Sequence, residues 1–135
     1  MSLTSIPDSI GDLDSLETLN LDCNQLTTIP NTISDLTKLR ILNLNCNRLT
    51  EIPDSIGNLI NLVCLDLRGN QLTSLPDSIS NLLNLESLYL GDNPFSVIPA
   101  VIAKLPNLKY LHLEGDQLIA IPDAISAMLN LSIYI

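Results

Sequence analysis

The chain has 135 residues, a formal net charge of -9 and 46% hydrophobic residues, but only 3% aromatic residues. The length fits one domain, and the acidic charge repels nucleic-acid phosphates and anionic lipid headgroups. No apolar run approaches the roughly 18 residues of a membrane span, and the first residues lack the basic and apolar regions of a signal peptide. We therefore expect neither nucleic acid nor membrane as a partner.

Residues 1–15 match the second half of a unit that then recurs in full. The first full copy begins at Leu16, and further copies begin every 23 residues at Leu39, Leu62, Leu85 and Leu108. Each reads L-x-x-L-x-L-x-x-N-x-L and continues x-x-[IL]-P-x-x-I-x-x-[LM], apart from the fourth copy, which has Phe95 at the eleventh residue, and the fifth copy, which has Asp at the Asn position. A fixed period of this kind predicts a stacked-repeat protein. We predict one domain over 1–135, made of a half repeat 1–15, full repeats 16–38, 39–61, 62–84, 85–107 and 108–130, and a partial repeat 131–135.

These motifs resemble the leucine-rich repeats (LRR). The 23-residue version with a Pro-led second half is similar to intracellular Ras-group and Roco-type proteins and to small bacterial LRR proteins, and the resemblance covers residues 2–135. It implies an α/β solenoid, a right-handed superhelix with a concave parallel β-sheet of about six short strands and short helical or 3-10 turns on the convex side. It also implies a non-catalytic module that binds a protein partner on its concave face.

Within each repeat, apolar residues fill seven positions, numbered here from Leu16 as position 1. In the first full repeat these are Leu16, Leu19, Leu21, Leu26, Ile29, Ile33 and Leu36. Positions 3 to 6 alternate between polar and apolar, so a short strand directs positions 3 and 5 to the outer face. The Pro after position 14 has the fixed φ that suits the first turn of a short helix.

Position 9 is Asn in four repeats, where a buried amide both donates to and accepts from the backbone as the strand turns away. These residues are Asn24, Asn47, Asn70 and Asn93, and the fifth repeat has Asp116. An ionised carboxylate has no proton to donate, so we predict either a looser fifth turn or a protonated Asp116.

The outer face of the predicted sheet forms columns, because equivalent positions of successive repeats lie side by side. Position 3 would hold Thr18, Ile41, Cys64, Ser87, Tyr110 and Ile133, and position 5 would hold Asn20, Asn43, Asp66, Tyr89, His112 and Ile135. Position 7 holds Asp22, Asn45, Arg68, Gly91 and Glu114. Exposed aromatic residues are typical interface anchors. We predict a partner-binding set on the concave face made of Cys64, Asp66, Arg68, Tyr89, Tyr110, His112 and Glu114.

An alternative is that Tyr89, Tyr110 and His112 only stack on one another to shield the end of the sheet. We expect Asp66 and Arg68 to point the same way from one strand, either as surface decoration or as both charges offered to a ligand. At position 2, Glu17 with Arg40 and Glu86 with Lys109 are predicted cross-strand ion pairs.

The last residues, Ser132 to Ile135, read SIYI. With an unbroken period, Tyr134 would take a core position, and Ile133 and Ile135 would lie on the outer face. An apolar strand at a sheet edge invites pairing with another chain. Ile133, Tyr134 and Ile135 are therefore candidates for self-association, and a homodimer through this edge is one expectation.

An enzyme would have to use Cys64 and His112, the single His of the sequence, and their geometry argues against catalysis. Two strands separate Cys64 from His112, about 10 Å across the sheet, whereas a nucleophile and its base need about 3 Å. The carboxylates near His112 match no standard metal-ligand spacing, so we expect no cofactor and no metal.

Cys23 and Cys46 share position 8 and are candidates for a disulfide, but buried or half-buried thiols are the preferred interpretation. An odd number of cysteines indicates a cytoplasmic location, and secretion stays possible if a signal peptide was removed.

Two alternatives to a concave-face binding module stay open. The chain would be a structural unit that self-assembles through uncapped ends, or the recognition segment of a larger signalling or effector protein.

Overall fold

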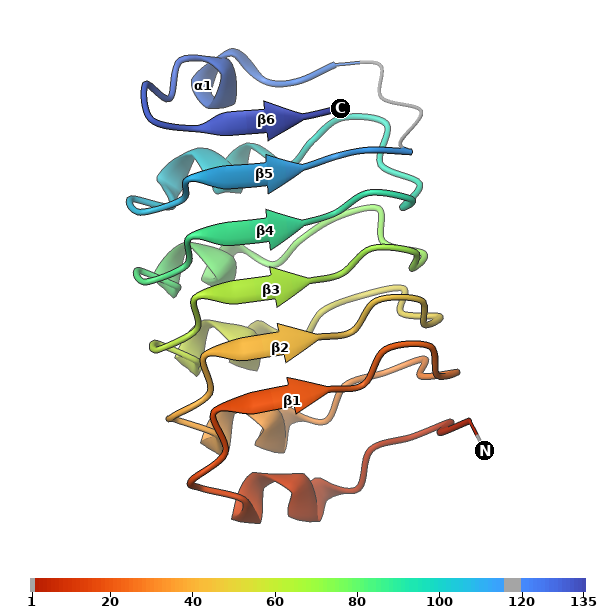
Figure 1. The fold of residues 1–135 in the computed structure, drawn as a ribbon. Coiled ribbons are helices and arrows are strands. Elements are labelled where there is room, and N and C mark those ends of the chain that lie inside the picture. Colours follow the sequence, from red (N-terminus) through yellow and green to blue (C-terminus); the bar gives the residue numbers. More distant parts are fainter. Residues whose placement is uncertain (1, 116–119) are drawn as a thin grey trace.

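The computed structural model describes residues 2–115 and 120–135, and in that part of the chain the repeats form one curved stack (Figure 1). One parallel sheet has the order β1-β2-β3-β4-β5-β6, so each strand pairs with the strand of the next repeat. The strands are β1 (Thr18–Asn20), β2 (Ile41–Asn43), β3 (Cys64–Asp66), β4 (Ser87–Tyr89), β5 (Tyr110–His112) and β6 (Ser132–Tyr134). The predicted solenoid with about six short strands is confirmed.

The opposite side of the stack carries one short helical turn per repeat (Figure 1). Five are 3-10 turns, η1 (Asp8–Asp12), η2 (Asn31–Asp35), η3 (Asp54–Asn58), η4 (Asp77–Asn81) and η5 (Ala100–Lys104), and the sixth is α1 (Asp123–Ser126). Each Pro lies one residue before the turn, and the carbonyl of Pro7, for example, accepts the N–H of Ile10 at 3.0 Å. That i to i+3 bond closes a 3-10 turn.

The core fills the space between the sheet and these turns. In the second full repeat the seven apolar positions are all buried, as Leu39, Leu42, Leu44, Leu49, Ile52, Ile56 and Leu59. Burying each such side chain contributes about 1.5–3 kcal/mol, so the repeated columns of leucine and isoleucine stabilise the stack. The first half-turn packs less completely, with Leu3 and Leu13 exposed.

The asparagines at position 9 pair with backbone groups, as predicted, and they also link successive turns. The Asn47 side chain accepts the N–H of Leu26 from the preceding turn at 3.0 Å. Its amide donates to Leu21 O of the preceding turn at 3.0 Å and to Leu44 O of its own turn at 3.1 Å. Asn70 repeats these contacts one turn later. Asp116 lies outside the described residues.

The last strand differs from the predicted register by one residue. Leu111 pairs with Ile133 and His112 with Tyr134, so the step between these strands is 22 residues and not 23. Ile133 therefore takes the core column and Tyr134 the outer face, and the prediction that placed them the other way round is wrong. The physical reason is that an aliphatic side chain fits the buried column, while the Tyr ring finds a neighbouring ring outside.

Candidate functional site

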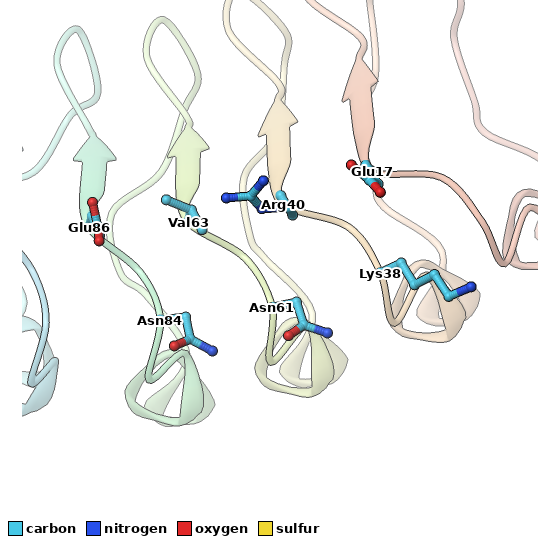
Figure 2. A pocket seen from close by; sticks show the side chains of 7 residues that line it. All are labelled: Glu17, Lys38, Arg40, Asn61, Val63, Asn84 and Glu86. Carbon is cyan, nitrogen blue, oxygen red and sulfur yellow. The ribbon is translucent and has the colours of Figure 1, made fainter.

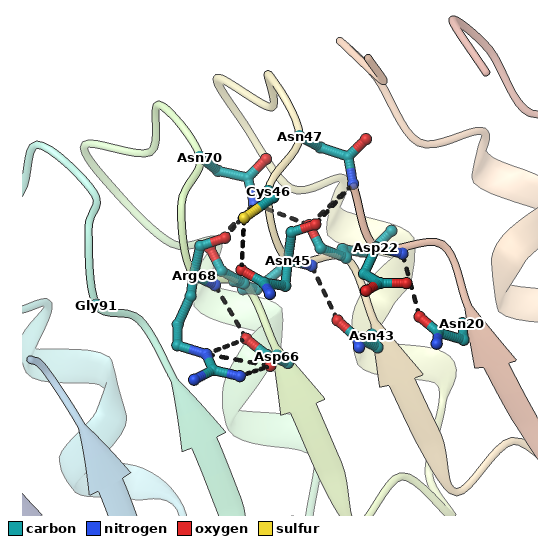
Figure 3. Close-up of polar contacts among 12 residues, drawn as sticks. Asn20, Asp22, Asn43, Asn45, Cys46, Asn47, Asp66, Arg68, Asn70 and Gly91 are labelled. Carbon is teal, nitrogen blue, oxygen red and sulfur yellow. Dashed lines mark hydrogen bonds and ion pairs between the residues drawn. The ribbon is translucent and has the colours of Figure 1, made fainter. Parts of the chain in front are cut away.

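The outer face of the sheet begins with a ladder of amides at position 5. Asn20 accepts the N–H of Asp22 at 3.1 Å, and Asn43 accepts the N–H of Asn45 at 3.0 Å (Figure 3). These bonds turn the chain at the end of each strand, in the manner of an Asx turn. They use the side-chain oxygen of each Asn, so the amide groups give this half of the face a polar character.

Asp66, at the end of β3, pairs with Arg68 just after that strand (Figure 3). Arg68 Nε donates to Asp66 Oδ1 at 2.9 Å, and Asp66 Oδ1 also accepts the Arg68 backbone N–H at 3.1 Å. Asp66 is only 7% exposed. The hydrogen bonds with Asp66 raise the pKa of the Arg68 guanidinium above its ordinary value. The expected common direction of the two side chains thus brings Asp66 and Arg68 into contact with each other, and a role in ligand binding stays a prediction.

A continuous stack of rings follows on strands β4, β5 and β6. The Tyr89 and His112 ring centroids are 4.2 Å apart, those of His112 and Tyr134 are 4.5 Å apart, and each pair is within 8° of parallel. The Arg68 guanidinium covers the other side of the Tyr89 ring, 4.9 Å from its centroid. Burial raises the pKa of the Tyr89 hydroxyl. The stack begins at Arg68 and ends at the edge strand.

Tyr110 belongs to the neighbouring column and is 43% exposed. It pairs in register with Ser87 on one side and Ser132 on the other, so small side chains flank its ring. The alternative in which Tyr89, Tyr110 and His112 stack together is right for Tyr89 and His112 only. Glu114 is exposed beyond the end of β5.

Cys64 is half-buried at the beginning of β3, two strands from His112. Burial, followed by the negative charge of Asp66, raises the pKa of the Cys64 thiol, and the nearby Arg68 only partly opposes this. The thiol is therefore held protonated, which is the opposite of what a nucleophile needs. Among the described residues, no group of three or more His, Cys, Asp or Glu side chains is arranged to hold a metal ion.

A shallow hollow of about 470 Å³ runs past the beginnings of the strands (Figure 2). In that view the Arg40 side chain extends toward Val63 and away from Glu17. Within residues 2–115 and 120–135, no ion pair joins Glu17 to Arg40, so that prediction is wrong, because solvent competes for two exposed charges on flexible side chains. The Lys109 to Glu86 pair is confirmed at 3.0 Å.

Position 8 carries a backbone feature that sequence reasoning missed. Cys23 and Cys46 both have φ 55°, Gly69 and Gly115 have φ 64° and 84°, and Asp92 has φ 56°. Glycine at two of these five positions was the available signal, because it adopts positive φ without strain. Both cysteines are exposed, which corrects the expectation of buried or half-buried thiols.

The comparisons with known families match this repeat pattern. The model described as "Leucine-rich repeat region" matches residues 39–133, and "Leucine rich repeat" matches residues 2–49. The chain belongs to the leucine-rich-repeat family. No curated protein matches it significantly. The narrower similarity to Ras-group and Roco-type LRR proteins is not shown by these matches and stays a prediction.

Solved LRR structures superpose over nearly the whole chain. A Leptospira interrogans LRR protein is 35% identical with TM-score 0.75, over 98% of this chain and 40% of its own. The PEPR1–AtPEP1 structure is 36% identical with TM-score 0.81, over 96% and 19%. A TDR receptor is 30% identical with TM-score 0.81, over 96% and 23%. The chain thus spans less than half of each of these proteins.

LRR membership and receptor-like structural neighbours together suggest a protein-interaction module, in a family that is generally non-catalytic. In the described part of the chain, no helix is long and apolar enough to cross a membrane.

Proposed function

We propose that this LRR domain binds a protein partner on the outer face of its sheet, without chemistry of its own. The observation that carries the proposal is the exposed Tyr110 beside the ordered stack of Tyr89, His112 and Tyr134. Aromatic side chains bury a large area on binding, and rings already fixed by stacking lose little conformational entropy.

The charge pattern of the face supports a partner segment that is neutral or basic. Arg68 is engaged by Asp66 and Tyr89, while Glu114 and Asp22 are exposed at the same edge of the sheet. With a net charge of -9, the field around the domain attracts cations and slows the approach of anions.

We place the domain in the cytoplasm on the basis of its odd number of cysteines. That the domain is the recognition segment of a larger signalling or effector protein stays a proposal.

The test is selection of binding peptides from a displayed random library, followed by measurement of Kd with purified variants. Tyr110→Ala should weaken the selected binders at least roughly tenfold, as expected for an aromatic anchor. Leu83→Ala, which changes an exposed apolar residue on the turn side of the stack, is the matched control. If Leu83→Ala weakens binding and Tyr110→Ala does not, the binding face has been misassigned.

Self-association through β6 is the second candidate. The strand is the last in the described sheet, and Ile135 next to it is 80% exposed. An edge strand of this kind pairs readily with another chain. Light scattering over a concentration series should then give a dimer that Ile135→Lys converts to monomer, and a monomer at every concentration would exclude it.

A further inference from the structure

Cys23 and Cys46 lie beside each other on the turns that follow β1 and β2. The Cys23 N–H donates to the carbonyl of Asn45 at 2.9 Å, so the two turns touch at the residue next to Cys46. Both cysteines have φ 55° and occupy the same position in consecutive repeats. Their side chains therefore leave the backbone in the same direction from neighbouring rungs, which lie about 4.8 Å apart in a parallel sheet.

The third turn provides a measure of how closely side chains at this position approach. A Cβ built on Gly69 would lie 3.3 Å from Cys46 Sγ and 3.4 Å from Cys46 Cα. A side chain at position 8 thus leans back onto the residue of the preceding turn. Because Cys46 stands to Cys23 as Gly69 stands to Cys46, the Cys46 Cβ leans toward Cys23. Disulfides need Cα atoms about 4.4–6.8 Å apart and Cβ atoms about 3.5–4.5 Å apart, and neighbouring rungs fall in that range.

The surroundings of Cys23 favour its protonated thiol over the thiolate. Desolvation raises the pKa of the Cys23 thiol, and the charges of Cys46 and Asp22 and side-chain hydrogen bonds to both raise it further. The Cys46 thiol donates to Asn45 Oδ1 at 3.2 Å (Figure 3). Both thiols are exposed, so a small oxidant reaches them directly.

We propose that Cys23 and Cys46 form a reversible disulfide on reaction with a low-molecular-weight disulfide such as glutathione disulfide. One protein thiolate attacks a sulfur of the oxidant, forming a mixed disulfide and releasing one glutathione. The second protein thiolate then attacks the protein sulfur of that mixed disulfide, the Sγ–Sγ bond forms and the second glutathione leaves. The protein loses two electrons, the oxidant gains them, and the two thiol protons end on the two glutathiones.

The crosslink would act on the polar half of the outer face. Asp22 and Asn45, whose backbone N–H groups are held by Asn20 and Asn43, directly precede the two cysteines. A bond between the cysteines fixes the spacing of these two rungs and closes the loop of 22 residues between positions 23 and 46. The proposal is independent of which partner the domain binds.

The experiment is incubation of the reduced full chain, at low protein concentration, with excess glutathione disulfide, followed by alkylation and tryptic mass mapping. Cleavage after Lys38, Arg40, Arg48 and Arg68 puts the three cysteines on separate peptides, 1–38, 41–48 and 49–68. We expect peptides 1–38 and 41–48 to be joined and two of three alkylatable thiols to be lost. Below the thiol pKa, the rate should rise roughly tenfold per pH unit with the thiolate fraction.

Two variants keep the result decisive. Cys64→Ser should form the same crosslink, whereas Cys23→Ser should keep Cys46 as a free thiol or a glutathione adduct in a monomer. Circular dichroism checks that both variants are folded. The proposal is overturned if wild-type protein keeps three alkylatable thiols, if peptide 49–68 enters the crosslink, or if the only disulfide joins two chains. Reduction with dithiothreitol should restore all three thiols.

Discussion

The Tyr134 ring lies over the His112 ring, with centroids 4.5 Å apart and planes within 8° of parallel. This contact exists because one residue is missing from the last step of the repeat, which turns Tyr134 outward. It makes the edge strand part of the ring stack and sets the position of the last aromatic side chain on the outer face.

Replacing Tyr134 with Ala should lower the free energy of unfolding by about 1 kcal/mol, because a stacked aromatic pair contributes about 0.5–1.5 kcal/mol beyond its burial. Urea unfolding followed by circular dichroism measures the change. Tyr134→Phe keeps the ring and should stay within about 0.5 kcal/mol of the wild type. An equal loss from Ile135→Ala, next to it and 80% exposed, would show that the stack contributes nothing.

Replacing Asn47 with Ala should cost about 2–4 kcal/mol, because it removes hydrogen bonds to two turns and leaves buried backbone groups unpaired. Asn43→Ala is the matched control. Asn43 makes one hydrogen bond, to Asn45 N–H, at a half-buried site, so its loss should cost about 1 kcal/mol or less. Equal costs in urea unfolding would contradict the role given to position 9.

Replacing Gly91 with Ala should destabilise the fourth turn by about 2–3 kcal/mol, because a Cβ there would overlap the backbone carbonyl of Glu114. A backbone atom cannot rotate away as a side chain can. Ser87→Ala, on the outer face of the same repeat, should change stability by less than about 0.5 kcal/mol. Thermal unfolding distinguishes the two, and a harmless Gly91→Ala would mean that the turns are spaced more widely.

Removing Arg68 should lower the free energy of unfolding by about 1 kcal/mol, because Asp66 is left buried without its cation and Tyr89 loses the guanidinium on its ring. The figure is modest because the Arg68 side chain is partly exposed. Arg48→Ala removes an exposed Arg with the same change of net charge and should be near neutral. Similar values for both variants would reduce the effect to net charge.

The hydroxyl of Tyr89 should ionise above the ordinary value of 10.0, because burial disfavours the phenolate. A pKa raised in the folded state means that the folded protein holds this proton more tightly than the unfolded chain. Its contribution to stability is thus fully present below about pH 10 and is lost as pH rises through the folded pKa. Phenolate absorbance of a Tyr110→Phe, Tyr134→Phe variant reports Tyr89 alone, and a midpoint at or below 10.0 would contradict the burial.

The sequence was sufficient for the architecture, because each repeat states the same local preferences. Leucine at positions 1, 4 and 6 and Pro after position 14 predict a strand and a helical turn in every copy, and Asn at position 9 predicts the turn between them in four copies. The described residues follow that order. The columns also placed Tyr89 beside His112 and Cys64 far from His112, because a 23-residue period determines which residues lie side by side in neighbouring strands.

Only the tertiary structure decided the local pairings. The sequence left open whether the Arg68 side chain would face solvent or contact its neighbours. Its contacts with Asp66 and Tyr89 depend on which side chains lie beside it in the folded sheet, because Tyr89 comes from the next strand. The shift that turned Tyr134 outward depends on whether Ile133 or Tyr134 fills the buried column better, which is a packing energy. The left-handed backbone at Cys23 and Cys46 likewise comes from the turn that stacking imposes, because neither residue prefers that conformation by itself.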